Sequence, residues 1–197
     1  MSGEKGEAFW RTIFEWLPFR WLWWLLMALR RGITGVEFYP DRHGLDRIRP
    51  LTDELRRVTE AHVFWVAGRK QFQSGEQLEK IKRLILPNPD SASLKCFESS
   101  LPDGMSIRDQ IREVTQMAIE KGIQVKWYSE FIGYSWWIAD PSGKNAFAHL
   151  EIAMPFSRRD RRPSIRISRS RHPEAFSELW NSYEKIWEKS ESQNGAR

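Results

Sequence analysis

A histidine and a glutamate two positions apart form the first group of residues that could do chemistry. His149 and Glu151 lie in a segment typical of a β-strand, so both side chains point to the same side of it. A histidine beside a carboxylate can serve as a general base or as half of a metal site. There is no third ligand at a recognisable spacing, so the sequence predicts no metal centre. A structural pair at the edge of the core is the alternative interpretation.

A run of arginines is the strongest local signal. The segment 157–172 holds seven of them: Arg158, Arg159, Arg161, Arg162, Arg166, Arg169 and Arg171. Guanidinium groups bind phosphate through paired N–H donors, so the run predicts an anion-binding patch for nucleic acid, anionic lipid or a nucleotide. Residues 158–162 are expected to form an exposed hairpin tip, because a polar turn is costly to bury. A solvated basic loop is the alternative.

Other kinds of chemistry have less support. The single cysteine, Cys96, excludes an intramolecular disulfide and a multi-cysteine zinc site, and it is expected in a loop. The glycine-rich patterns of nucleotide-binding loops and of serine hydrolases do not occur. Of the remaining histidines, His62 opens an apolar strand and is interpreted as structural, while His43 and His172 are expected in loops. The sequence therefore indicates no cofactor.

The residues that would position these groups alternate between strand-like and helix-like segments. Strands are expected at 36–39, 62–67, 84–86, 123–128, 132–139, 146–154 and 164–167, and helices at 50–60, 74–82, 106–121 and 173–189. Ser106 and Asp109 resemble a capping box at the start of the third helix. This order predicts an α/β domain in which a mixed sheet is covered by helices on both faces.

The chain divides into three zones. Residues 1–31 are rich in tryptophan, residues 32–190 form the α/β domain, and residues 191–197 are a polar tail expected to fray. The first zone holds Trp10, Trp16, Trp21, Trp23 and Trp24.

The first zone is interrupted by Glu15, Pro18 and Arg20, which leaves an uninterrupted apolar run only at 21–29, too short to cross a bilayer. Tryptophan favours the headgroup region, and Arg30 and Arg31 follow directly. We expect an amphipathic helix lying on an anionic membrane surface, with packing on the domain or on a partner subunit as the alternative. With one cysteine, a cytoplasmic location at the inner face of the membrane is predicted.

Four segments of the chain, 32–42, 62–68, 82–89 and 173–190, resemble bacterial phospholipase D-like domains. The resemblance covers about four-fifths of the chain and implies the fold of that family. Active members carry the motif His-x-Lys-x4-Asp, in which the histidine attacks phosphorus and the lysine binds the phosphate. Here the strand ending at Asp140 places Gly133 and Ser135 in the histidine and lysine positions. Asp140 alone matches, and an aspartate before Pro-Ser-Gly is also an ordinary turn residue.

The resemblance therefore implies a catalytically inactive module that acts by binding. Two alternatives stay open: a phosphodiesterase completed by His149 or by a partner subunit, and a nucleic-acid-binding protein that uses the 158–171 strip. The resemblance also implies a homodimer formed through the central motif strands. Segment 127–139 is dense in aromatic rings: Trp127, Tyr128, Phe131, Tyr134, Trp136 and Trp137. One sheet face cannot hide all of them, so a helix, another chain or residues 1–31 must cover some.

Overall fold

The computed structural model describes residues 36–73, 78–99, 106–130, 133–152 and 161–193. The chain separates into two units, Met1–Gly35 and Val36–Arg197, and the described residues all belong to the second. The helix predicted within residues 1–31 lies outside the described part. Among the described residues, none of the helices combines the length and the apolar character needed to cross a bilayer.

The described residues form one mixed sheet, which confirms the predicted α/β class. Its spatial order is β1-β7-β6-β5-β2-β3-β4-β8. β2, β3 and β4 pair in parallel, and the other neighbouring pairs are antiparallel. The bounds are β1 (Val36–Tyr39), β2 (Ala61–Phe64), β3 (Ile81–Pro87), β4 (Gln124–Tyr128), β5 (Tyr134–Ala139), β6 (Phe147–Ile152), β7 (Ser164–Ser168) and β8 (Glu191–Ser192).

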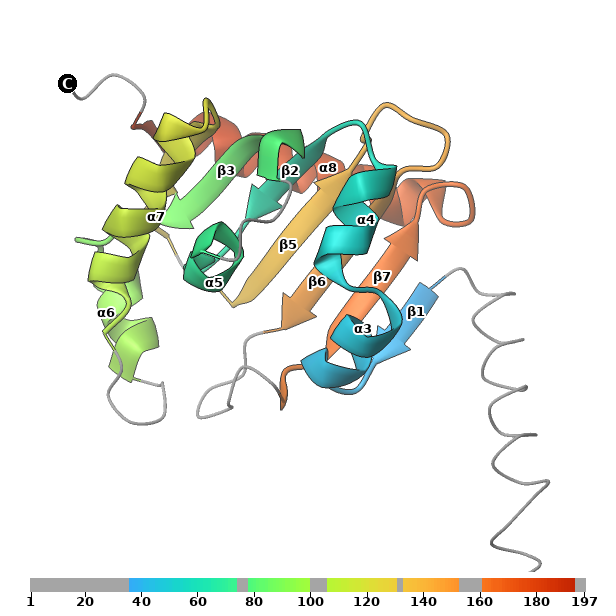
Figure 1. Ribbon diagram of the computed structural model, residues 1–197, viewed down its shortest axis with the longest axis horizontal. Coiled ribbons are helices and arrows are strands. Elements are labelled where there is room, and N and C mark those ends of the chain that lie inside the picture. Colours follow the sequence, from blue (N-terminus) through green and yellow to red (C-terminus); the bar gives the residue numbers. More distant parts are fainter. Residues whose placement is uncertain (1–35, 74–77, 100–105, 131–132, 153–160, 194–197) are drawn as a thin grey trace, which may run out of the picture. The chain divides into compact units, whose positions relative to one another are not determined.

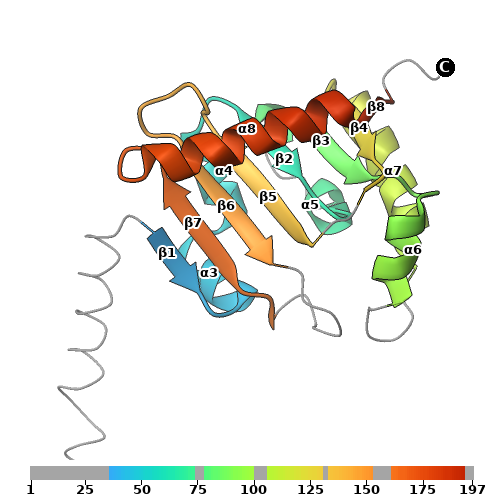
Figure 2. The ribbon, with the colours of Figure 1, turned by 180° about the vertical axis from the view of Figure 1, so that it is seen from behind.

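Helices lie on both sides of this sheet (Figures 1 and 2). α8 (Pro173–Lys189) crosses one face, where Tyr183 lies against Trp136 of β5. α3 (Arg42–Ile48), α4 (Leu51–Arg57), α5 (Arg69–Gln73) and α7 (Arg108–Glu120) lie toward the opposite face. The short helix η1 (Leu78–Lys80) leads into β3, and α6 (Ala92–Ser99) precedes α7.

Several element predictions were wrong for local reasons. α3 was missed, although Asp41 caps it by accepting a hydrogen bond from the Gly44 backbone N–H at 2.7 Å. His43 therefore lies in a helix, and so does Cys96, which belongs to α6. The tail was expected to fray from residue 191, yet β8 pairs with β4.

The capping box at the start of α7 was also wrong. α7 begins at Arg108 without a side-chain cap of its own. Glu98 of α6 accepts instead, from the backbone N–H of Ile107 at 2.7 Å and from the Ser106 hydroxyl at 3.4 Å. A glutamate nine residues before Ile107 thus accepts the hydrogen bond that the local pattern assigned to Asp109.

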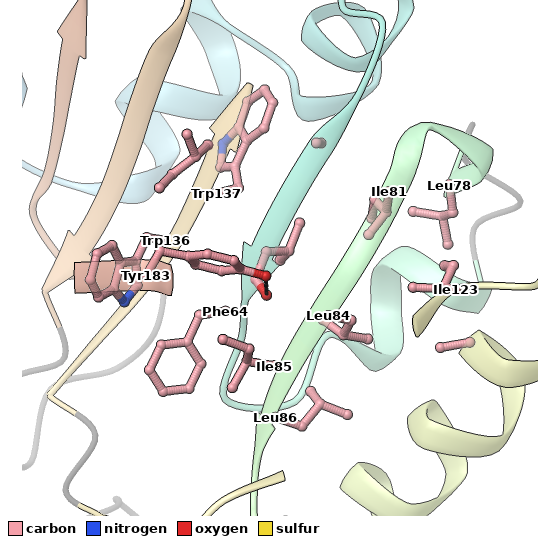
Figure 3. Packing of buried hydrophobic residues seen from close by; sticks show 14 of the residues in the cluster. Phe64, Leu78, Ile81, Leu84, Ile85, Leu86, Ile123, Trp136, Trp137 and Tyr183 are labelled. Atoms are coloured by element: carbon pink, nitrogen blue, oxygen red, sulfur yellow. Dashed lines mark hydrogen bonds between the residues drawn. The ribbon is translucent and has the colours of Figure 1, made fainter. Parts of the chain in front are cut away.

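Much of the hydrophobic core lies around β2, β3 and β4 (Figure 3). Leu84, Leu86 and Val125 are completely buried, as are Ile111 and Val114 of α7. Strands buried on both faces read as continuous apolar runs, which explains why β2 and β3 were recognisable in the sequence. α8 has the predicted bounds and contributes Phe176, Tyr183 and Trp187 to the same core.

The tryptophans proposed to pair two copies are largely buried within the chain. Trp136 is 4% exposed beneath Tyr183 of α8, and Trp137 is 8% exposed against Phe147 on the opposite face. The indole N–H of Trp127 donates to Thr115 of α7 at 3.0 Å. Helices and neighbouring strands of the same chain therefore cover much of this segment, and pairing between copies stays a prediction.

Candidate anion-binding site

Charged side chains gather on the sheet face that α3 and α4 cover, across β1, β7 and β6. We call these ten residues the buried polar cluster: Glu37, Tyr39, Arg42, Arg49, Glu54, His149, Glu151, Arg162, Ser164 and Arg166. Strand register creates two rows within it, because residues two apart share a face. Glu37, Arg166 and His149 are neighbours in the first row, and Tyr39, Ser164 and Glu151 are neighbours in the second.

The charges of the first row are balanced once Arg49 and Glu54, which contact it from the helical side, are included. Arg49 holds Glu37 through two hydrogen bonds of 2.9 Å and reaches Glu54 at 3.2 Å. Arg166 lies 3.4 Å from Glu37 and 3.7 Å from Glu54, and its guanidinium stacks 4.0 Å above the ring of Phe147. Two arginines thus face two carboxylates, and such a buried network stabilises the fold only when its members stay paired.

Tyr39 lies beside this row, and its hydroxyl donates a hydrogen bond to Glu37. Burial, followed by the hydrogen bond and the negative charge of Glu37, raises the pKa of Tyr39 to about 12. The tyrosine therefore stays protonated and acts as a donor at neutral pH.

His149 ends the first row as a neutral, enclosed imidazole. Its ring lies 5.4 Å from that of Trp137 and 5.7 Å from that of Phe147, and its Nε2 is 3.9 Å from Glu54. Burial lowers the pKa of His149 well below its usual value, and the positive charges of Arg166, Arg49 and Arg42 lower it further. No described residue accepts or donates a hydrogen bond at Nε2. His149 is therefore a neutral histidine with little access to a substrate.

The second row is centred on Glu151. One carboxylate oxygen is held by Arg42 of α3, and the other lies 3.4 Å from Arg162, which precedes β7. Arg42 also contacts the half-exposed Asp46 at 3.3 Å. The Nε–H of Arg162 and the hydroxyl of Ser164 are buried, and neither has a hydrogen-bond partner among the described residues. This end of the cluster therefore has donors available for a further acceptor.

The arginines of the 157–172 run that the structure describes do not form one surface. Arg162 is 7% exposed, so its predicted place on an exposed tip was wrong: Glu151 draws it into the cluster. Arg166 faces away from Ile165 and Ile167, as predicted, but into the cluster. Arg161 is exposed, while Arg158 and Arg159 lie outside the described residues.

Two further arginines of the run lie beyond the opposite end of β7. Arg169 donates to the Pro141 carbonyl at 2.7 Å, and its guanidinium lies 5.9 Å from the ring of Phe176. Arg171 follows in an exposed turn. A five-residue strand therefore separates these two from Arg162.

The positions that match the phospholipase D motif do not converge. Gly133 precedes β5 and Asp140 follows it, so a six-residue strand, roughly 20 Å long, lies between them. Asp140 adopts a φ of +46°, and its carboxylate accepts the backbone N–H groups of Thr59 at 2.8 Å and Glu60 at 3.0 Å. These contacts give Asp140 a structural role in the turn after β5.

Sequence reasoning missed six members of the cluster: Glu37, Tyr39, Arg42, Arg49, Glu54 and Ser164. One signal was present, because Glu54 lies on the same side of its helix as Leu51, Leu55 and Val58. A glutamate on an apolar helix face indicates a buried partner. The described residues contain no group of three side chains placed to hold a metal ion.

The His62 ring, on the opposite face, was expected to be a satisfied structural residue. It lies edge-on to the rings of Trp180 and Tyr183, yet neither nitrogen has a hydrogen-bond partner among the described residues. Burial lowers the pKa of His62, although Glu60 opposes this shift. It is part of the packing beneath α8.

The sequence matches no family model and no curated protein. Among solved structures, it resembles TrmBL2, an archaeal chromatin protein whose structure shows a novel mode of DNA binding, with a TM-score of 0.46 and 13% identity. That similarity covers 95% of this chain and 64% of TrmBL2, so the chain spans less than two thirds of it. It also resembles Nuc from Salmonella typhimurium, a phospholipase D family member, with a TM-score of 0.44, 10% identity, and coverage of 81% and 97%.

Proposed function

We propose that this chain is a phospholipase D-like module that binds a phosphate-bearing ligand without cleaving it. The observation that carries the proposal is the Glu151 end of the buried polar cluster. Two guanidinium groups meet one buried carboxylate there, and the Arg162 Nε–H and Ser164 hydroxyl lack partners among the described residues. A phosphate oxygen would accept from both unpaired donors.

The charges around this end also favour an anion. Segment 158–162 carries four arginines and one aspartate, and Arg161 is exposed next to the buried Arg162. The Arg42 side chain is 20% exposed, whereas the side chain of Glu151 is 10% exposed. A guanidinium binds phosphate through parallel N–H donors, whereas a lysine provides only a point charge. These donor groups therefore suit a phosphate group.

The absence of turnover is proposed from the residues at the motif positions. Gly133 has no nucleophile, and Ser135 cannot provide a fixed positive charge. His149, the candidate replacement, is buried and enclosed by two aromatic rings. This supports a binding role over a phosphodiesterase role.

Location at an anionic membrane surface is proposed from the sequence alone. Residues 1–31 combine five tryptophans with Arg20, Arg30 and Arg31. If they lie on the membrane, the ligand phosphate could belong to a lipid headgroup; a nucleic-acid backbone has the same chemistry.

Calorimetric titration of the full chain with pyrophosphate tests the proposal. Arg162→Ala should weaken binding at least about tenfold, because it removes a paired donor and the charge behind it. Arg112→Ala is the matched control: this exposed arginine of α7 pairs with Asp90 and Asp109, far from the cluster in the sheet order. Equal weakening by both variants, or no binding by the unmodified chain, would reject the site.

The same chain titrated with single-stranded DNA and with phosphatidylserine vesicles identifies the source of the phosphate. Binding of DNA that depends on Arg162 would favour nucleic acid, and vesicle binding that depends on Arg162 would favour lipid.

A further inference from the structure

Glu151 differs from the other two carboxylates of the buried polar cluster. Glu37 and Glu54 share Arg49 and Arg166, so two negative charges face two positive ones. Glu151 alone lies between Arg42 and Arg162, which come from two separate segments of the chain. In the described residues it is the single acid within 4.0 Å of Arg162.

The two contacts of Glu151 are unequal. Arg42 lies close to one oxygen and has Asp46 as a second partner at 3.3 Å. Arg162 lies 3.4 Å from the other oxygen, longer than the 2.7–2.9 Å typical of a charge-assisted hydrogen bond. The Arg162 contact is therefore the one that an incoming anion can replace at the lower cost, while Arg42 stays in place.

We infer that Glu151 is an internal counter-ion that occupies the ligand's position on Arg162 and is exchanged when phosphate binds. This inference rests on the proposed function, and it adds a residue that sets the affinity. Before binding, Glu151 neutralises a buried guanidinium that would otherwise lack a partner. During binding, its negative charge repels the incoming anion, so the site rejects weak or poorly matched anions.

The inference predicts that a substitution at the binding site strengthens ligand binding. Glu151→Gln keeps an acceptor oxygen toward Arg42 and removes the negative charge, so pyrophosphate should bind about tenfold more tightly. A purely structural role predicts the reverse, because loosened arginines would bind less well. Glu37→Gln makes the same chemical change in the balanced first row and should alter the affinity less than about twofold.

Calorimetric titration of the full-length unmodified chain, Glu151→Gln and Glu37→Gln with pyrophosphate separates these outcomes. Tighter binding by Glu151→Gln alone supports the exchange. Equal tightening by both variants indicates a general charge effect and overturns it, as does unchanged or weaker binding by Glu151→Gln. If the unmodified chain does not bind pyrophosphate, the proposed function itself has failed; if it binds and only the tightening is missing, this inference alone has failed.

A crystal structure of the unmodified chain with pyrophosphate decides the case even if Glu151→Gln does not fold. The expected arrangement has Arg162 on the phosphate and Arg42 still on Glu151. Phosphate bound elsewhere, with Arg162 still on Glu151, would overturn the inference.

Discussion

The two ends of the sheet bury different kinds of side chain. Under α3 and α4, the strands β1, β7 and β6 bury glutamates, arginines and a histidine. Around β2, β3 and β4, the interior holds almost only leucine, isoleucine, valine and aromatic side chains. Burying apolar groups stabilises a fold directly, whereas buried ion pairs roughly balance their desolvation cost. The apolar end therefore contributes most of the stability of the fold, and the polar end is the candidate for ligand binding.

The largest expected effect lies in the apolar end. Phe64→Ala removes a fully buried ring beside Trp136 and Tyr134 and should lower the free energy of unfolding by about 4 kcal/mol. Phe38→Ala is the matched control, because Phe38 is 54% exposed on β1 and should cost less than about 1 kcal/mol. Urea denaturation measures both. Similar losses for the two variants would contradict the assignment of the core.

The next effect tests whether the polar end is a coupled network. Glu54→Ala leaves Arg49 and Arg166 short of a buried carboxylate and should cost about 3 kcal/mol. Asp53→Ala, one residue away on the exposed side of α4, breaks only its surface pair with Arg56 and should cost less than about 1 kcal/mol. Urea denaturation measures both variants. If Glu54→Ala lowers the free energy of unfolding by less than Asp53→Ala does, the residues of the cluster are not coupled.

Acid should lower the stability of the fold through two buried histidines, His62 near the apolar end and His149 at the polar end. Burial lowers the pKa of His62 and, more strongly, that of His149 in the folded chain, whereas the unfolded value is near 6.5. Below pH 6.5 the unfolded chain binds protons that the folded chain does not, so stability is complete above this pH and falls as the pH decreases. Each histidine contributes up to about 1.4 kcal/mol per pH unit.

Thermal unfolding between pH 7 and pH 5 measures this dependence. His149→Phe, which keeps a ring beside Trp137 and Phe147, should flatten the pH profile, and His62→Phe should flatten it less. Profiles parallel to that of the unmodified chain would show that neither histidine is buried in its neutral form.

The apolar end could be predicted from the sequence and the polar end could not. The strand at 84–86 and the helix at 173–189 could be predicted from an apolar run and from apolar periodicity, which are local properties. The helix predicted at 74–82 was wrong at its end, because β3 begins at Ile81. The cluster is formed by register: Glu37, Arg166 and His149 are neighbours only because β1, β7 and β6 align. A local pattern can indicate that a charged residue is buried, as with Glu54, but it does not identify a partner more than a hundred positions away, as with Arg42 and Glu151.

The arginine run shows the same limit. Composition predicted an anion-binding patch, but in the structure Arg162 lies on Glu151, Arg166 lies between Glu37 and Glu54, and Arg169 lies beyond the far end of β7. Burial of Arg162 depended on a glutamate in the neighbouring strand, which a hairpin prediction treats as a separate element. The concentration of positive charge was therefore visible in the sequence, whereas the residues that lie together were not.

The most direct test of the central claim measures binding and cleavage in one sample. A fluorescent oligonucleotide containing phosphodiester bonds is incubated with the full chain, its anisotropy is recorded, and the same sample is analysed by mass spectrometry. We expect the oligonucleotide to bind, to be recovered intact, and to bind at least about tenfold more weakly to Arg162→Ala than to Arg112→Ala. Cleavage products that disappear with His149→Ala would contradict the account, because they would make His149 catalytic.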